Sequence, residues 1–221
     1  LSPYLREIAN IDTAIVATAI SEPLEPRIEA MIAEARSCWK PAANSEAPSE
    51  AEVMSRLRII KRKVAFLVAL SDLSRIFDGR ATTAWLSELA EASVAAAIDH
   101  LLLAAHEGGK LRLRNPAAPS DGSGLIVLGM GKLGACELNY SSDIDLVVFF
   151  DEEAGIVPDP DDAIEVFPRM MRRLVRILQE RTADGYVFRT DLRLRPDPGS
   201  TPLAIPVEAA MIYYEGRGQN W

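Results

Sequence analysis

The stretches LIVLGMGKLG (125–134) and SSDIDLVVFF (141–150) decide the fold class of this chain. Each contains a short apolar run bounded by Gly, Ser or Asp, which is typical of a β-strand and predicts strands over Leu125–Leu128 and Ile144–Phe150. A third candidate strand, Tyr186–Leu194, alternates polar and apolar residues. The three runs are too few and too short for a large sheet. They predict a small α/β or α+β unit.

The residues before this unit predict helices. Leu57–Phe77 carries apolar side chains every three or four residues, Leu73 and Ile76 among them, and Thr82–His106 is rich in Ala and Leu. A further helix is expected over Pro168–Thr182, with the proline in its first turn. The fold class predicted is α+β, with a helical N-terminal half packed on a small sheet that has flanking helices.

Two stretches rich in turn-forming residues mark connections: one at 41–50, rich in Pro, Ser, Ala and Glu, and one at 115–124, which is the expected domain boundary. The predicted division is a helical region at 1–118, an α/β core at 119–205 and the start of a following helical segment at 206–221. Because the chain begins at Leu1 and ends at Trp221, directly after a helical pattern, we expect it to be a fragment of a longer protein.

Composition excludes several classes of function. The 221 residues include 48% hydrophobic and 25% charged residues, an ordinary globular balance. Lys and Arg number 24 against 32 Asp and Glu, so the net charge of −8 argues against a nucleic-acid partner. No apolar run is as long as a membrane span, and Cys38 and Cys136 lack paired spacing. We therefore expect a cytoplasmic protein with no membrane or nucleic-acid partner.

Paired carboxylates begin the second strand. Side chains alternate along an extended chain, so Asp143 and Asp145 project to the same side. Two neighbouring carboxylates repel each other unless a cation compensates them, and oxygen ligands favour Mg²⁺. An isolated Asp-x-Asp is more often a solvated strand end, but this pair follows a glycine-rich turn and opens an apolar strand. The pattern favours a metal site.

The third strand carries another acid among arginines. Alternation places Arg189, Asp191, Arg193 and Arg195 on one face. An ordinary solvated face gives the same pattern, and by itself this strand leaves both interpretations open. With the Asp-x-Asp pair, Asp191 completes a three-carboxylate cluster of the kind used in two-metal phosphoryl or nucleotidyl transfer, and arginines can meet phosphate charge. This arrangement requires three strands side by side.

The glycine-rich turn has an alternative interpretation. Gly129–Gly134 follows an apolar strand and Asp151 ends the next one, which formally satisfies the fingerprint of a dinucleotide-binding fold. The space between Gly134 and Ser141 is short for a crossover helix, and acids inside the following strand do not suit a buried parallel sheet. The dinucleotide interpretation is therefore the weaker one.

Four longer sequence motifs resemble those of a known family. The stretches GMGKLG (129–134), ELN (137–139), SSDIDL (141–146) and RTDLRLRP (189–196) resemble the bifunctional glutamine synthetase adenylyltransferase/adenylyl-removing enzymes. These belong to the polymerase-β-like nucleotidyltransferases and contain two related catalytic halves. Asn139, the DLR wording at 191–193 and the stretch YYEGRGQNW (213–221) look more like the half that removes AMP.

This resemblance implies a reaction and a set of partners. The expected reaction is phosphorolysis, in which phosphate attacks the AMP–tyrosine bond of adenylylated glutamine synthetase and gives ADP. Regulation of nitrogen assimilation, and control by the PII signalling protein, are implied in the same way. The alternatives are the adenylylating half, which would use ATP, and a non-enzymatic or dinucleotide-binding module.

The resemblance also implies roles for particular residues. Two Mg²⁺ or Mn²⁺ ions are expected on three catalytic and metal-binding acids, and phosphate or nucleotide contacts are expected around the glycine turn and the third strand. The expected acids are Asp143, Asp145 and Asp191, and the expected phosphate- or nucleotide-binding residues are Gly131, Lys132, Ser141, Ser142, Arg193 and Arg195.

Overall fold

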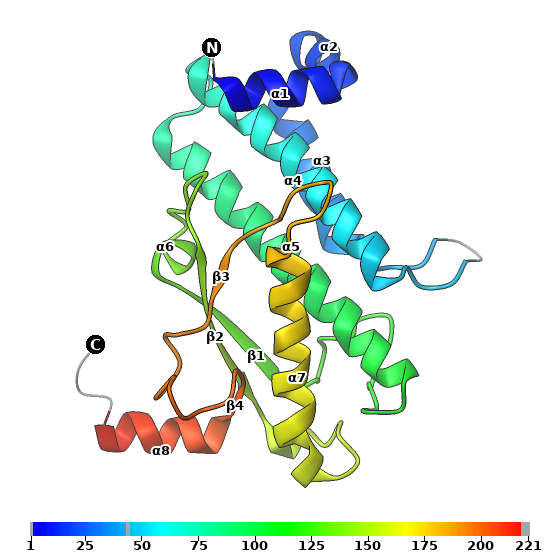
Figure 1. Ribbon diagram of the computed structural model, residues 1–221, viewed down its shortest axis with the longest axis vertical. Helices are drawn as coiled ribbons and strands as arrows, with labels where there is room; N and C mark the ends of the chain where they lie inside the picture. Colours follow the sequence, from blue (N-terminus) through cyan, green and yellow to red (C-terminus); the bar gives the residue numbers. More distant parts are fainter. Residues whose placement is uncertain (1, 43–44, 218–221) are drawn as a thin grey trace.

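The computed structural model describes residues 2–42 and 45–217, so residues 218–221 of the YYEGRGQNW stretch lie outside the described residues. Within the described part, eight helices accompany one small mixed sheet (Figure 1), which confirms the α+β class. The elements are α1 Pro3–Ile11, α2 Thr13–Ser21, α3 Leu24–Ser37, α4 Glu50–Leu73, α5 Gly79–Glu107, β1 Leu125–Met130, α6 Gly131–Gly134, β2 Ile144–Phe150, a 3₁₀ turn Glu152–Ala154, α7 Pro160–Gln179, β3 Thr190–Asp191, β4 Ile205–Pro206 and α8 Val207–Arg217.

The long helices begin at side-chain caps. Ser49 and Glu52 form a capping box at the start of α4: the Glu52 backbone N–H donates to the Ser49 hydroxyl, and the Glu52 carboxylate accepts from the Ser49 N–H at 2.7 Å. The Asp78 carboxylate accepts from the Ala81 N–H at 2.7 Å and starts α5. Helices α3, α4 and α5 pack on one another, and α7 packs against α5 (Figure 1).

Strand β2 is the centre of the sheet. It pairs antiparallel with β1 and parallel with β3 and β4. Because β1 and β2 are antiparallel and α6 between them spans only Gly131–Gly134, the chain has no parallel crossover at the glycine turn. The dinucleotide interpretation is therefore excluded by the topology.

Helices cover both faces of β2. The Phe150 ring stacks on Phe167 of α7 with ring centroids 4.8 Å apart, while the Phe149 ring meets Tyr214 of α8 edge to face at 6.5 Å. Since neighbouring strand residues point to opposite faces, α7 and α8 lie on opposite sides of the sheet. Asp145 shares the face of Phe149, away from α7. Buried side chains of the helices and of the sheet form one hydrophobic cluster.

Two of the sequence predictions about helices were wrong in detail. Helix α7 begins at Pro160, about two turns before the predicted start at Pro168, which lies inside the helix. The Asp159 carboxylate caps this start by accepting from the Asp161 N–H. The predicted helix to Phe77 ends at Leu73, and the Leu73 and Ile76 side chains are 68% and 64% exposed. The chain turns away after Leu73, so these two side chains do not join the buried apolar face of α4.

The third strand is much shorter than predicted, because its backbone donors have other partners. Only Thr190 and Asp191 pair with β2. The N–H groups of Val187 and Phe188 both donate to the carbonyl of Leu178, at the end of α7, and the Arg193 N–H donates to the Asp191 carboxylate. The first and second strands are confirmed, with β1 extending two residues further to Met130.

Helix α5 is long and apolar enough, by length and composition alone, to cross a membrane, and it is the single such helix among the described residues. Most of its apolar window is buried inside the protein, against α3, α4 and α7. The internal core of this chain therefore accounts for its apolar character.

A buried arginine ties the helical half to the segment that leads into β3. Arg58 of α4 is 1% exposed and donates to the carbonyls of Met54, Gly185 and Glu180. Burial lowers the pKa of this guanidinium, and the nearby Glu180 and Asp184 charges oppose that shift. The three carbonyls satisfy the donors of a charge that would otherwise be costly to bury.

We expect Arg58→Met to lower the free energy of unfolding by about 2–3 kcal/mol, because it leaves buried carbonyls without donors. Urea unfolding measures the change. Arg62→Met on the same helix is the matched control, since no hydrogen bond or ion pair holds Arg62 among the described residues, and it should change stability by less than about 0.5 kcal/mol. Equal effects of the two substitutions would contradict the role assigned to Arg58.

Candidate active site

The register of the sheet brings the three predicted acids together. Asp145 of β2 lies directly opposite Asp191 of β3 in a parallel pair, and Asp143 comes immediately before β2. The Ile144 N–H donates to the Arg189 carbonyl at 2.9 Å, which fixes the junction between the two strands. The three strands β1, β2 and β3 lie side by side, as the three-carboxylate interpretation requires.

The three carboxylates influence one another electrostatically. Burial, followed by the charges of Asp191 and Asp143, raises the pKa of the Asp145 carboxyl above its ordinary value. A raised pKa means that the folded protein disfavours the charged form of this group. In the absence of a cation, the contribution of Asp145 to stability therefore falls as the pH rises through its pKa.

Two arginines pair with the other acids. The Arg189 guanidinium donates to Asp143 at 2.5 Å and to the Ser141 carbonyl at 2.8 Å. The Arg193 guanidinium forks onto Asp191, with Nε 2.8 Å from Oδ2, and these hydrogen bonds lower the pKa of Asp191. No hydrogen bond to the Asp145 carboxylate is present among the residues described. Asp145 is thus the acid without a direct partner.

The donor set fits a hard cation, although the acids do not form a ready-made site. Within the described ranges, no group of three Asp, Glu, His or Cys side chains is arranged to hold a metal ion. Arg189 and Arg193 each pair with one of these acids, Asp143 and Asp191 respectively. Three carboxylates at one edge, with repulsion that raises a pKa, are nevertheless the oxygen ligands that Mg²⁺ or Mn²⁺ takes.

The glycine turn lies against the acids. Gly131 has φ +53°, and a Cβ atom there would be 2.9 Å from Oδ2 of Asp145. The backbone therefore lies so close to the Asp145 carboxylate that a side chain at position 131 would clash with it. Glycine has no Cβ and tolerates a positive φ, so it suits this position. Lys132 reaches Ser142, with Nζ 3.4 Å from its hydroxyl oxygen.

The predicted phosphate-binding serines are held in a tight turn. The side-chain oxygen of Asn139 accepts from the Ser142 hydroxyl at 2.9 Å and from the Ser141 N–H at 3.2 Å. Ser142 thus lies close to Lys132 and to the acids, whereas Ser141 faces a separate cavity beside helix α4. The structure therefore brings the two serines to different surroundings.

Arg195 is used mainly by its own loop. Its guanidinium donates to the carbonyls of Leu192, Pro198 and Thr201. These bonds fold the segment after β3 into a compact turn. Arg195 also lines the groove of the acids, but its donors are engaged by backbone oxygens.

A groove of about 510 Å³, here called the groove of the acids, is lined by Asp143, Asp191 and several arginines. Asp145 is not among its lining residues, although it lies opposite Asp191 in the sheet. Sequence reasoning missed Arg172 and Gln179 of α7, which line the groove, and it also missed the pairing of Arg189 with Asp143. Arg172 lies on a polar face of α7 that the sequence indicates, but no sequence pattern shows that this face borders the groove with Asp143 and Asp191. Acids that can hold cations, beside arginines that can meet phosphate, form the combination used in phosphoryl and nucleotidyl transfer.

Comparison with known proteins identifies the family. The whole chain, residues 1–221, matches the family model described as glutamate-ammonia ligase adenylyltransferase, and the chain belongs to this family. Similar curated proteins, each named bifunctional glutamine synthetase adenylyltransferase/adenylyl-removing enzyme, come from Agrobacterium fabrum (72% identical), Rhizobium meliloti (64%) and Mesorhizobium japonicum (55%). Each match covers 100% of this chain but 22% of the relative's length.

Gly131→Ala should test the close contact in the glycine turn. An alanine in this left-handed conformation costs about 1–2 kcal/mol, and its Cβ would push the Asp145 carboxylate away. We expect thermal or urea unfolding to show the loss. Gly216→Ala in α8 is the control, because a Cβ there meets no atom of the described residues within 4 Å and the residue is helical. A fully stable Gly131→Ala variant would argue against the observed contact.

Proposed function

We propose that this chain carries the adenylyl-removing activity of its family, a metal-dependent phosphorolysis that releases AMP from adenylylated glutamine synthetase as ADP. The observation that carries the proposal is the juxtaposition of Asp145 and Asp191 across β2 and β3, with Asp143 beside them. The names of the relatives support the substrate protein, since they are called glutamine synthetase adenylyltransferase/adenylyl-removing enzymes.

The residues present can supply the chemistry of this reaction. Asp143, Asp145 and Asp191 would hold Mg²⁺ or Mn²⁺, and two bound ions would stabilise the attacking and leaving oxygens. Arg193 and Lys132 lie where they can neutralise phosphate charge. Arg189 and Arg193 must release their acids when cations bind, and both then become free to contact phosphate oxygens.

The proposed reaction needs no strong general base. An oxygen of inorganic phosphate attacks the AMP phosphorus, the bond from phosphorus to the tyrosyl oxygen breaks, and that oxygen takes up a proton. The nucleophile is already an anion, so the arginines, together with the cations that the carboxylates would hold, suffice to position it. No histidine lines the groove among the described residues, which accords with this chemistry.

The assay that tests the proposal identifies the nucleotide released from adenylylated glutamine synthetase by the purified chain with Mg²⁺ and phosphate. Phosphate-dependent ADP is the expected product. Formation of AMP-protein and pyrophosphate from ATP and unmodified glutamine synthetase would instead assign the adenylylating activity. Control by PII and a cytoplasmic location are further proposals from the family resemblance, and adding PII to the same assay tests the first.

Asp145→Asn should separate activity from stability. It removes one expected metal ligand, so we expect ADP release to fall by about 10²- to 10³-fold. The folded structure disfavours the charged form of Asp145, so the neutral amide should leave the free energy of unfolding unchanged or raise it. Asp121→Asn, on an exposed residue away from the groove, is the matched control. Undiminished ADP release by Asp145→Asn would remove Asp145 from the site.

Metal binding should depend on pH. The raised pKa of Asp145 makes protons compete with the cation, so Mg²⁺ should raise the melting temperature more at about pH 8 than at about pH 5. Thermal unfolding with and without Mg²⁺ at both pH values measures this difference. A melting temperature that Mg²⁺ does not change at either pH would count against a metal site at these acids.

A further inference from the structure

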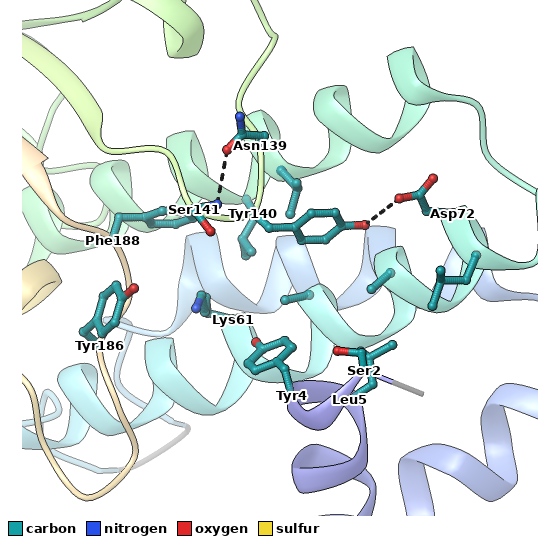
Figure 2. Close-up of a pocket in the computed structure, with 15 residues that line it drawn as sticks. Ser2, Tyr4, Leu5, Lys61, Asp72, Asn139, Tyr140, Ser141, Tyr186 and Phe188 are labelled. Carbon is teal, nitrogen blue, oxygen red and sulfur yellow. Dashed lines mark hydrogen bonds between the residues drawn. The ribbon is translucent and has the colours of Figure 1, made fainter.

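A second cavity, here called the tyrosine pocket, lies between the helical half and the turn that leads into β2 (Figure 2). Its volume of about 490 Å³ is in the range of small-molecule sites. Helices α1, α4 and α5 contribute to it, together with the turn at 139–141 and the segment 186–188. The residues that give it its chemistry are Tyr4, Lys61, Asp72, Tyr140, Tyr186 and Phe188.

Lys61 is the cation of this pocket, and it has no acidic partner. Across the residues described, no carboxylate lies within ion-pair distance of its Nζ, which sits 5.2 Å from the centre of the Tyr186 ring. Burial lowers the pKa of this ammonium group. A desolvated cation held only by an aromatic ring is a favourable place for an anion, because an anion would restore the missing charge.

The opposite end of the pocket carries an acid, Asp72, in place of a cation. The Tyr140 hydroxyl points at the Asp72 carboxylate, with 3.4 Å between the oxygens, and the ring spans the pocket between its two ends (Figure 2). Asp72 lies eleven residues beyond Lys61 on α4, which is about 16 Å along the helix axis. The acid therefore does not compensate Lys61, and an anionic group is accepted at the Lys61 end alone.

The walls between these ends are apolar. Leu86 and Leu89 of α5 and Ala65 and Ala69 of α4 line the cavity, and Phe188 closes it on the side of β3. A flat apolar body can bury its surface here without leaving polar groups unpaired. One ammonium balances one negative charge, so a phosphate dianion would leave excess charge in an apolar cavity, whereas a carboxylate would not.

We propose that the tyrosine pocket binds a small aromatic carboxylate, with the carboxylate on Lys61 and the ring among the tyrosines and Phe188. This site is separate from the groove of the acids. Arg189 stands between them, since its guanidinium bonds both Asp143, which lines the groove, and the carbonyl of Ser141, which lines the pocket. The proposal does not depend on the reaction proposed above.

Naphthoate is a suitable probe, and naphthylmethanol is its neutral counterpart. Calorimetric titration of the purified protein should show that naphthoate binds and that Lys61→Met weakens it about tenfold, as loss of a charged hydrogen bond predicts. The affinity for naphthylmethanol should stay unchanged by this substitution. Lys61→Arg should keep most of the naphthoate affinity. Lys63→Met, which removes a lysine of the same helix that pairs with Asp12 outside the pocket, is the matched control and should have no effect.

Ala69→Trp provides a second variant, because a large side chain on the wall should fill the pocket and abolish binding of both probes. Circular dichroism confirms that each variant is folded. Naphthoate binding that is equal in the wild type, Lys61→Met and Ala69→Trp would overturn the proposal. So would equal sensitivity of naphthoate and naphthylmethanol to Lys61→Met, because the ammonium would then not select the anion.

Discussion

Strand β2 is the constraint on which the rest of this structure depends. Hydrogen-bonded partners lie on both of its edges, and helices pack on both of its faces near Phe149 and Phe150. A strand held in this way cannot slip by one residue, because a slip would exchange the side chains of the two faces. The position of Asp145 is therefore fixed by apolar packing several residues away. Packing at one end of the strand thus holds a costly charge in place at the other.

The three acids are unequal because their surroundings are unequal. Asp143 and Asp191 each lie against an arginine, whereas Asp145 is partly withdrawn from water and feels the charges of both other acids. The arginines compensate charge in this arrangement and can also meet a phosphate group. Repulsion among these acids destabilises the charged form of Asp145 until a proton or a cation neutralises it. This repulsion is the physical reason to expect cation binding here.

The helical half does more than provide a core. Arg58 holds the loop before Tyr186, and the Ser55 hydroxyl donates to Asp184 at 2.9 Å in the same loop. These contacts place the segment that continues to Arg189 and β3. Helix α4 thus positions one side of the groove of the acids and, through Lys61, forms the floor of the tyrosine pocket. The two cavities have no lining residue in common, and Arg189 links them by donating to Asp143 of the groove and to the Ser141 carbonyl beside the pocket.

The sequence by itself determined the α+β class, the first two strands, the repulsion between the like charges of the Asp-x-Asp pair, and the motifs that identify the family. Local patterns suffice for these, because period, turn residues and charge spacing are properties of neighbouring residues. Tertiary structure alone decided that β3 is two residues long, that Arg189 pairs with Asp143, and that Arg172 and Lys61 line cavities. These features depend on which distant carbonyl or carboxylate accepts a hydrogen bond from each donor. The Leu178 carbonyl, for example, accepts from the N–H groups of Val187 and Phe188. No short-range pattern encodes such a choice, because it follows from how the helices pack against the sheet.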